Sequence, residues 1–189
     1  MVYSYQPVSD KVFNTIPISN IKEPFSFNIK QSFKKGRNAG LGVGEISEDK
    51  VLSPGDRDYQ TIRKVFEENY GSKMIADGTH PALSQTFVSC TLYYDYNASY
   101  GHRDWCEANF LTLAIVPCYG DLMVYEIEYE LFKYGIFQTK YTYRYSMKGA
   151  TWIGLIPFFW LNLFTNSYED ALANTALQFL SDAKKDGLF

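Results

Sequence analysis

The stretch from Leu122 to Met147 reads LMVYEIEYELFKYGIFQTKYTYRYSM and carries the strongest pattern in the chain. Before the pair Tyr134-Gly135, aromatic and aliphatic residues alternate with glutamate, and after that pair tyrosine alternates with Thr, Lys and Arg. Strict alternation of this kind is typical of strands with one buried face. The stretch therefore predicts a β-hairpin with one aromatic face and one charged face.

The register of this hairpin depends on the length of its turn. A three-residue turn at 134–136 sets Glu130 opposite Lys140 and Glu126 opposite Arg144. A turn one residue shorter would set charged residues opposite aromatic ones. Opposite charges favour the paired register, and a slip by one residue would turn every side chain to the wrong face. The three-residue turn is therefore the prediction.

The remaining elements can be placed around the hairpin. Alternating residues predict strands at about 25–30 and 86–96. Capping residues predict helices at about 55–70 and 168–186, the second one opened by a capping box at Ser167-Tyr168-Glu169-Asp170. The expected fold is α+β in two layers: a mainly antiparallel sheet of about four strands against two helices, in the order β-α-β-β-β-α. Residues 1–24 contain three prolines and are expected to form an extended N-terminal arm or tether, with a single α+β domain over 25–189.

Composition excludes some classes of function. The chain has 189 residues, 17% of them aromatic, and a net charge of −3. A slightly acidic chain lacks the basic face of a nucleic-acid-binding protein. No apolar run reaches the roughly 18 residues of a membrane-spanning helix, and the first residues do not resemble a signal peptide.

The three cysteines, Cys90, Cys106 and Cys118, have no CxxC spacing, so we expect no zinc site. Two interpretations stay open. One is a disulfide plus a free thiol in an oxidising compartment. The other is three buried thiols, because cysteine is among the most often buried residue types.

One segment matches the sequence pattern of a catalytic motif but lacks the other motifs that accompany it. The segment His102-Arg103-Asp104-Trp105-Cys106-Glu107-Ala108-Asn109 fits the H-R-D-x-x-x-x-N loop of protein kinases. No V-A-I-K-type lysine precedes it and no D-F-G follows it, so a polar loop is the preferred interpretation. An enzyme using His102, Asp104 and Glu107 stays as a minor alternative. The expectation is that the protein is not an enzyme, with no cofactor and no metal site.

Two apolar stretches at 109–119 and 152–164 are the informative feature for function. Each adjoins a strand and contains a proline, so neither can be an uninterrupted helix. Either both pack together as core at one end of the sheet, or the second exposes a membrane or partner contact surface. The candidate contact residues are Trp152, Ile153, Leu155, Ile156, Phe158, Phe159, Trp160, Leu163 and Phe164.

The segments LTLAIVPCYGDLMVYEIEYEL (111–131) and TWIGLIPFFWLNLF (151–164), with a capped final helix, resemble small bacterial cell-envelope lipoproteins. The likeness covers roughly residues 85–187. In topology alone, the order of elements is also similar to the LPS-assembly lipoprotein and the N-terminal domain of TolB. The resemblance implies a protein on the periplasmic side of the envelope, anchored through an N-terminal lipidated cysteine and without catalytic residues. This chain has Met1 and no lipobox, and Val2 to Pro24 would suit the tether.

The expected function is therefore that of a non-enzymatic envelope lipoprotein domain. It would bind a protein partner or lipid in envelope assembly or transport. The alternative is an α+β module that holds an apolar small molecule between sheet and helices. That ligand would be lined by Tyr94, Tyr129, Tyr141 and Tyr143.

Overall fold

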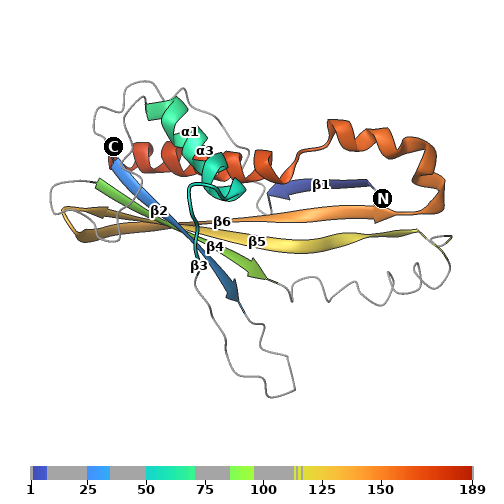
Figure 1. Cartoon of the computed structure of the whole chain (residues 1–189), viewed down its shortest axis with the longest axis horizontal. Helices are drawn as coiled ribbons and strands as arrows, with labels where there is room; N and C mark the ends of the chain where they lie inside the picture. The colour runs from blue at the N-terminus through green and yellow to red at the C-terminus, as the bar shows by residue number, and fades with distance from the viewer. Residues whose placement is uncertain are drawn as a thin grey trace, which may run out of the picture.

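The computed structural model describes residues 2–7, 25–34, 50–70, 86–95, 113, 115 and 117–188. Figure 1 shows a long sheet with its helices on one side. In chain order the elements are β1 (Val2–Pro7), β2 (Phe25–Lys34), β3 (Lys50–Val51), α1 (Arg57–Tyr70), β4 (Thr86–Asp95), β5 (Cys118–Lys133), β6 (Ile136–Thr151), the 3-10 helix η2 (Ile153–Phe164) and α3 (Tyr168–Lys185).

The sheet has six strands in the order β1-β6-β5-β4-β2-β3 within the described ranges. The pair β2–β4 is parallel and the other pairs are antiparallel. The α+β class holds, but the expected four strands, two helices and order β-α-β-β-β-α are wrong. The sheet is mixed, and β1, β3 and η2 are additional elements.

The parallel pair follows from the connection between its strands. Helix α1 lies between β2 and β4 in the chain and packs on the sheet, so the chain crosses over and enters β4 in the same direction as β2. A crossover through a helix is the usual route to parallel neighbours. The alternation inside a single strand carries no information about the direction of its neighbour.

Strand β1 comes from the first residues of the expected arm. It pairs with the last part of β6, from Val2 opposite Ala150 to Pro7 opposite Tyr145. The Tyr5 amide donates to the Asn166 carbonyl over 3.3 Å, and the Tyr5 ring packs edge-on against Tyr168 at 5.7 Å between ring centroids. These contacts are with residues far along the chain, so the proline-rich composition of the arm could not predict them.

The predicted register in the centre of the hairpin is confirmed, but the predicted length of its turn is wrong. Glu130 lies opposite Lys140 as predicted. The turn has two residues, Tyr134 and Gly135, with φ of 52° and 76°. Positive φ at both positions is the conformation of a type I′ turn, whose twist suits a hairpin. A bulge beside Leu131 supplies the missing residue and restores the predicted pairing.

The core lies between one face of the sheet and the helices α1 and α3. Phe179 on α3 is fully buried and stacks on Tyr129 of β5, with ring centroids 4.6 Å apart. Phe66 on α1 contacts both Phe179 and Phe27 of β2. Alternate residues of β2, β4 and β5 fill the sheet side, as alternation predicted. They are Phe25, Phe27, Ile29, Val88, Cys90, Leu92, Ile127, Tyr129 and Leu131.

Both ends of α3 are set by local sequence. The Asp170 amide donates to Ser167 Oγ over 3.1 Å, and the Ser167 amide donates to the Asp170 carboxylate over 3.1 Å, which confirms the capping box. At the other end Gly187 has φ of 71°, and the Leu188 amide donates to the Ala183 carbonyl over 2.9 Å. This is a Schellman ending, which glycine adopts without strain.

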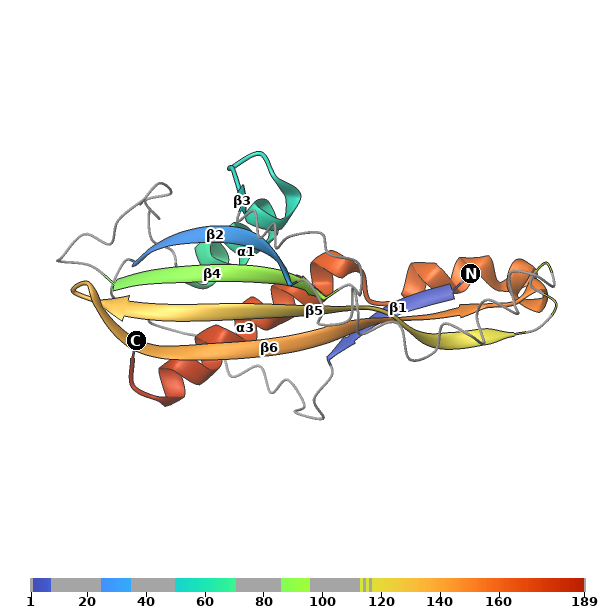
Figure 2. The same cartoon turned by 90° about the horizontal axis from the view of Figure 1, so that it is seen from below.

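The hairpin is longer than the layer of helices that covers it. Strands β5 and β6 have 16 residues each, about 50 Å of extended chain. Figures 1 and 2 show α1 and α3 over the half that carries the turn, while η2 and β1 lie at the other half. The two halves therefore present different surfaces.

Candidate functional site

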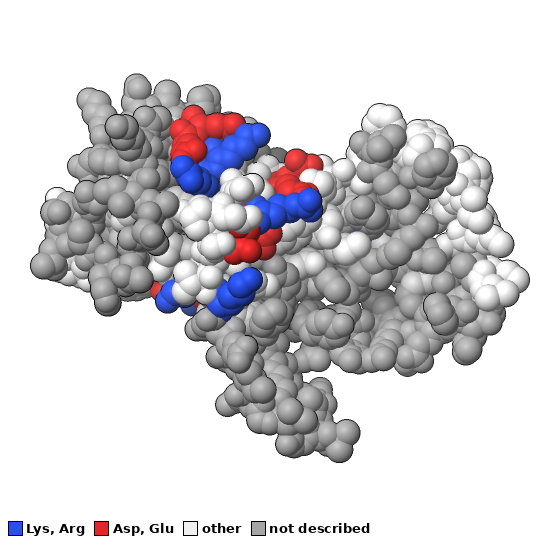
Figure 3. Space-filling model, viewed as in Figure 1, with Lys and Arg blue, Asp and Glu red and all other residues white. Residues whose placement is uncertain are grey.

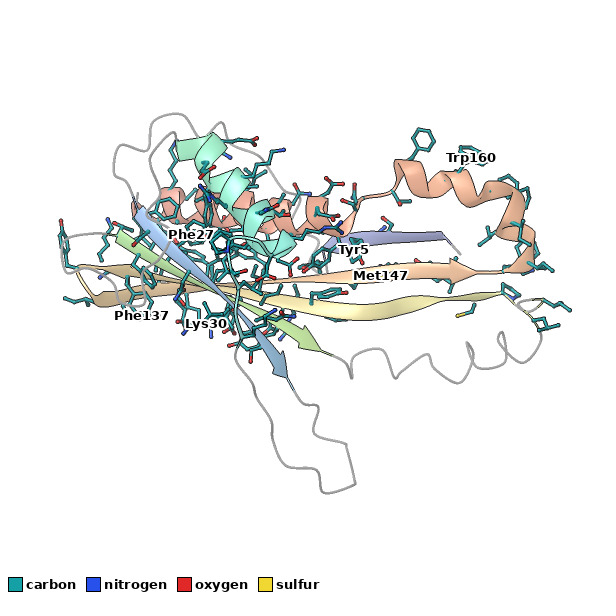
Figure 4. All side chains as sticks on the ribbon, in the orientation of Figure 1. Tyr5, Phe27, Lys30, Phe137, Met147 and Trp160 are labelled. Atoms are coloured by element: carbon teal, nitrogen blue, oxygen red, sulfur yellow. The ribbon has the colours of Figure 1, made fainter. Side chains whose placement is uncertain are left out.

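Helix η2 carries a group of large apolar side chains in contact with solvent. Phe164 is 79% exposed and Ile156 is 66% exposed. The exposed members, called the η2 surface below, are Trp152, Ile153, Ile156, Phe158, Trp160, Leu161 and Phe164. Figure 4 shows Trp160 on the side of η2 away from the sheet. These side chains are not part of the buried core.

Trp152 joins the two apolar stretches of the sequence. Its indole Nε1 donates to the carbonyl of Ile115 over 3.1 Å. Its ring lies so close to the backbone of Gly154 that a Cβ there would overlap it. Ile115 itself is exposed. The two stretches therefore meet, as one interpretation predicted, but their described side chains there face solvent instead of forming a shared core.

The structure places the remaining predicted contact residues as follows. Leu155 is partly buried, and the side chains of Phe159 and Leu163 lie outside the described residues. Leu161, in the η2 surface, and Ile115, in the first apolar stretch, are also exposed and were not among the predicted contact residues. Both residues lie inside the same two apolar stretches. The sequence therefore identified the right stretches but not every exposed residue within them.

The η2 surface lies in a part of the chain without charge. No Asp, Glu, Lys, Arg or His occurs from residue 149 to residue 168. Figure 3 shows the charged atoms gathered over the half with α1 and α3, whereas the described atoms at the η2 end are white. A contiguous exposed apolar patch of this kind marks an interaction site more often than ordinary surface.

Three of the four predicted ligand-lining tyrosines bond to α3 or to its C-cap residue, Asp186. Tyr129 is fully buried, and its hydroxyl lies 3.0 Å from Thr175 Oγ1. The Tyr143 hydroxyl donates to Asp182 over 2.9 Å, and the Tyr141 hydroxyl donates to Asp186. Burial raises the pKa of the Tyr143 hydroxyl, and the bond to Asp182 raises it further. The side chain of Tyr94 lies outside the described residues.

These contacts weigh against the alternative of a ligand held between sheet and helices. A molecule in contact with Tyr129 would have to displace Phe179, which already stacks on its ring. A molecule lying among all three tyrosines would also have to break their hydroxyl contacts to α3 and its C-cap residue. These tyrosines therefore hold α3 against the sheet.

Two of the three glutamates on the polar sheet face, Glu126 and Glu128, form ion pairs. Glu126 is almost fully buried and accepts from Arg144, the residue opposite it. Lys140 pairs with Glu128 over 2.8 Å, although Glu130 is the residue directly opposite. The hydrogen bond to Glu128 raises the pKa of Lys140. This arrangement is that of a charged sheet face.

The cysteines differ in state. Cys118 is disulfide-bonded, whereas Cys90 is a free thiol, fully buried in the core. Burial raises the pKa of the Cys90 thiol. The structure thus agrees with the interpretation of one disulfide and one free thiol. The third cysteine, Cys106, and the kinase-like segment with His102, Asp104 and Glu107 lie outside the described residues.

Thiol labelling tests this assignment. In protein that is unfolded but not reduced, we expect one alkylated cysteine per chain, at Cys90, and three after reduction. In the native protein Cys90 should react slowly, because burial and a raised pKa both suppress its thiolate. The measurement is the intact mass, with peptide mapping for the position. Three labels without reduction would contradict the disulfide.

No protein-family model matches the chain, and no curated protein matches it. The resemblance to envelope lipoproteins therefore rests on the sequence segments quoted above. Within the described ranges, no helix has both the length and the apolar character needed to cross a membrane.

Proposed function

We propose that this is a non-enzymatic protein of the bacterial envelope that attaches to an apolar partner surface, protein or lipid, through the η2 surface. The observation that carries the proposal is the exposure of seven large apolar side chains on an uncharged segment. Exposing this much apolar area to water has a free-energy cost, and covering it gives about 25 cal/mol per Å2. Binding would recover that free energy.

Two observations support an envelope location. The disulfide at Cys118 suits an oxidising compartment such as the periplasm. The sequence segments that resemble envelope lipoproteins include η2 and most of β5. Both favour the periplasmic side of the envelope, with the N-terminal lipid anchor of the full-length form that the resemblance implies.

The position of β1 fits such an anchor. Val2 lies opposite Ala150, two residues before Trp152. Figures 1 and 2 both place the N-terminus at the η2 end of the molecule. A lipid attached ahead of Val2 would therefore extend from the protein next to the η2 surface.

Photo-crosslinking in cells tests the proposal. A photoreactive residue at position 160 of the full-length product should form crosslinks to an envelope component and appear in the membrane fraction. The same residue at Thr142, which is exposed on the polar face of β6, is the matched control and should form none. Recovery wholly in the soluble cytosol, without crosslinks from position 160, would overturn the proposed function.

A further inference from the structure

We infer that the η2 surface binds the interfacial layer of a lipid bilayer, with η2 lying in the plane of the membrane. This inference rests on the proposed function and names its partner. The argument uses the distribution of exposed side chains around η2, the absence of charge, and the length of the segment.

Exposed apolar side chains occur in each of the three rows of side chains along η2. A 3-10 helix has three residues per turn, so residues three apart form a row. Ile153 and Ile156 belong to one row, Phe158, Leu161 and Phe164 to a second, and Trp160 to the third. A groove on a protein or on a second copy would cover one side of the helix and leave the others in water. A helix that is apolar all round requires an apolar medium around it, such as a core or a membrane.

Helix η2 can enter that layer without burying a charge, because it lies inside the uncharged stretch from 149 to 168. A charged side chain inside a membrane costs several kcal/mol, and this segment would bring none. The indole N–H of Trp152 is already bonded to Ile115. That ring can therefore move into an apolar layer without leaving a donor unsatisfied. Charge and hydrogen bonding both match the uncharged acyl region beneath the headgroups.

The length of η2 sets how it can lie. Its 12 residues, interrupted by Pro157, are too few to span a bilayer. Tryptophan is enriched at the membrane–water boundary because its ring is apolar and its N–H is polar. A short apolar segment with Trp160 exposed on it fits a position in the interface, about 5–10 Å deep.

Vesicle flotation of the purified chain tests the inference. The probes are vesicles of phosphatidylcholine alone and of phosphatidylcholine with phosphatidylglycerol. The wild-type chain should float with both, and binding should persist at about 1 M salt, where the Debye length is about 3 Å. Binding that requires phosphatidylglycerol and is lost in salt would overturn the inference, because it would be electrostatic.

A matched pair of variants locates the contact. The variant Ile156→Ser with Phe164→Ser removes two exposed side chains of the η2 surface and should lower the partition coefficient about tenfold or more. The control is Tyr134→Ser with Ile136→Ser at the opposite end of the hairpin. Ile136 is 66% exposed, as Ile156 is, and the control should bind as the wild type does. Equal losses in both variants would overturn the inference.

Failure here and failure of the proposed function can be told apart. If the chain does not float but position 160 crosslinks to a protein in cells, the lipid inference is wrong and the proposed function stands. If sedimentation shows a dimer that the η2 variant abolishes, and vesicles are not bound, the partner is a second copy. If neither vesicles nor crosslinks are found, both proposals are wrong.

Discussion

The substitution Phe179→Ala is expected to lower the free energy of unfolding by about 3–5 kcal/mol. Phe179 is fully buried at the meeting point of α3, α1 and the sheet. Its ring stacks on Tyr129 at 4.6 Å and contacts Tyr141 at 5.6 Å and Phe66 at 6.2 Å. Alanine would leave a cavity between three rings that are fixed by their own elements, so the site could not collapse to fill it.

Urea unfolding followed by circular dichroism measures the effect. The control is Phe137→Ala, which removes the same atoms from a side chain that is 52% exposed and has an edge contact with Phe132. The control should cost about 1 kcal/mol, mostly for the lost aromatic pair. Similar midpoints for the two variants would contradict the assignment of Phe179 to the centre of the core.

The second large effect is expected from Thr175→Val, at about 1–3 kcal/mol. The Thr175 hydroxyl donates to the Leu172 carbonyl over 2.8 Å, so its oxygen is left to accept the proton of the Tyr129 hydroxyl. Valine has nearly the same shape but no acceptor. The fully buried Tyr129 hydroxyl would then lose the partner that the structure gives it.

A double-mutant cycle separates this penalty from packing. Tyr129→Phe alone should cost less than Thr175→Val, because it removes the donor and leaves Thr175 bonded to Leu172. Adding Tyr129→Phe to Thr175→Val should recover most of the lost stability, since no unpaired hydroxyl remains. Additive costs in the double variant would show that the two hydroxyls are not coupled.

Local signals in the sequence predicted most element positions. The capping box at Ser167 and Asp170 and the glycine at position 187 set both ends of α3, and each acts within one turn of chain. Charge pairing gave the central hairpin register because Glu126 and Arg144 come from adjacent strands of one hairpin. The predicted turn length was wrong because a bulge can compensate for a shorter turn. The alternation of residues on either side does not reveal such a bulge.

The sheet edges could not be predicted in this way. Strand β1 pairs with residues more than 130 positions away, and β3 has only two residues, too few for any periodic pattern. For the candidate site, the sequence identified the stretch 152–164 but not its environment. An apolar run has the same composition in a core and on a surface, and only the covering elements decide between the two.

Binding of η2 to a membrane would also determine how the long hairpin lies relative to that membrane. The Tyr134-Gly135 turn is at the opposite end of strands that are about 50 Å long. Figures 1 and 2 show η2 running along the length of the hairpin, so with η2 in the plane of the membrane the hairpin would lie along the membrane surface. Tyr134, Ile136 and Phe137 would then form a second exposed apolar group at the far end of the hairpin, separate from the membrane contact that η2 makes.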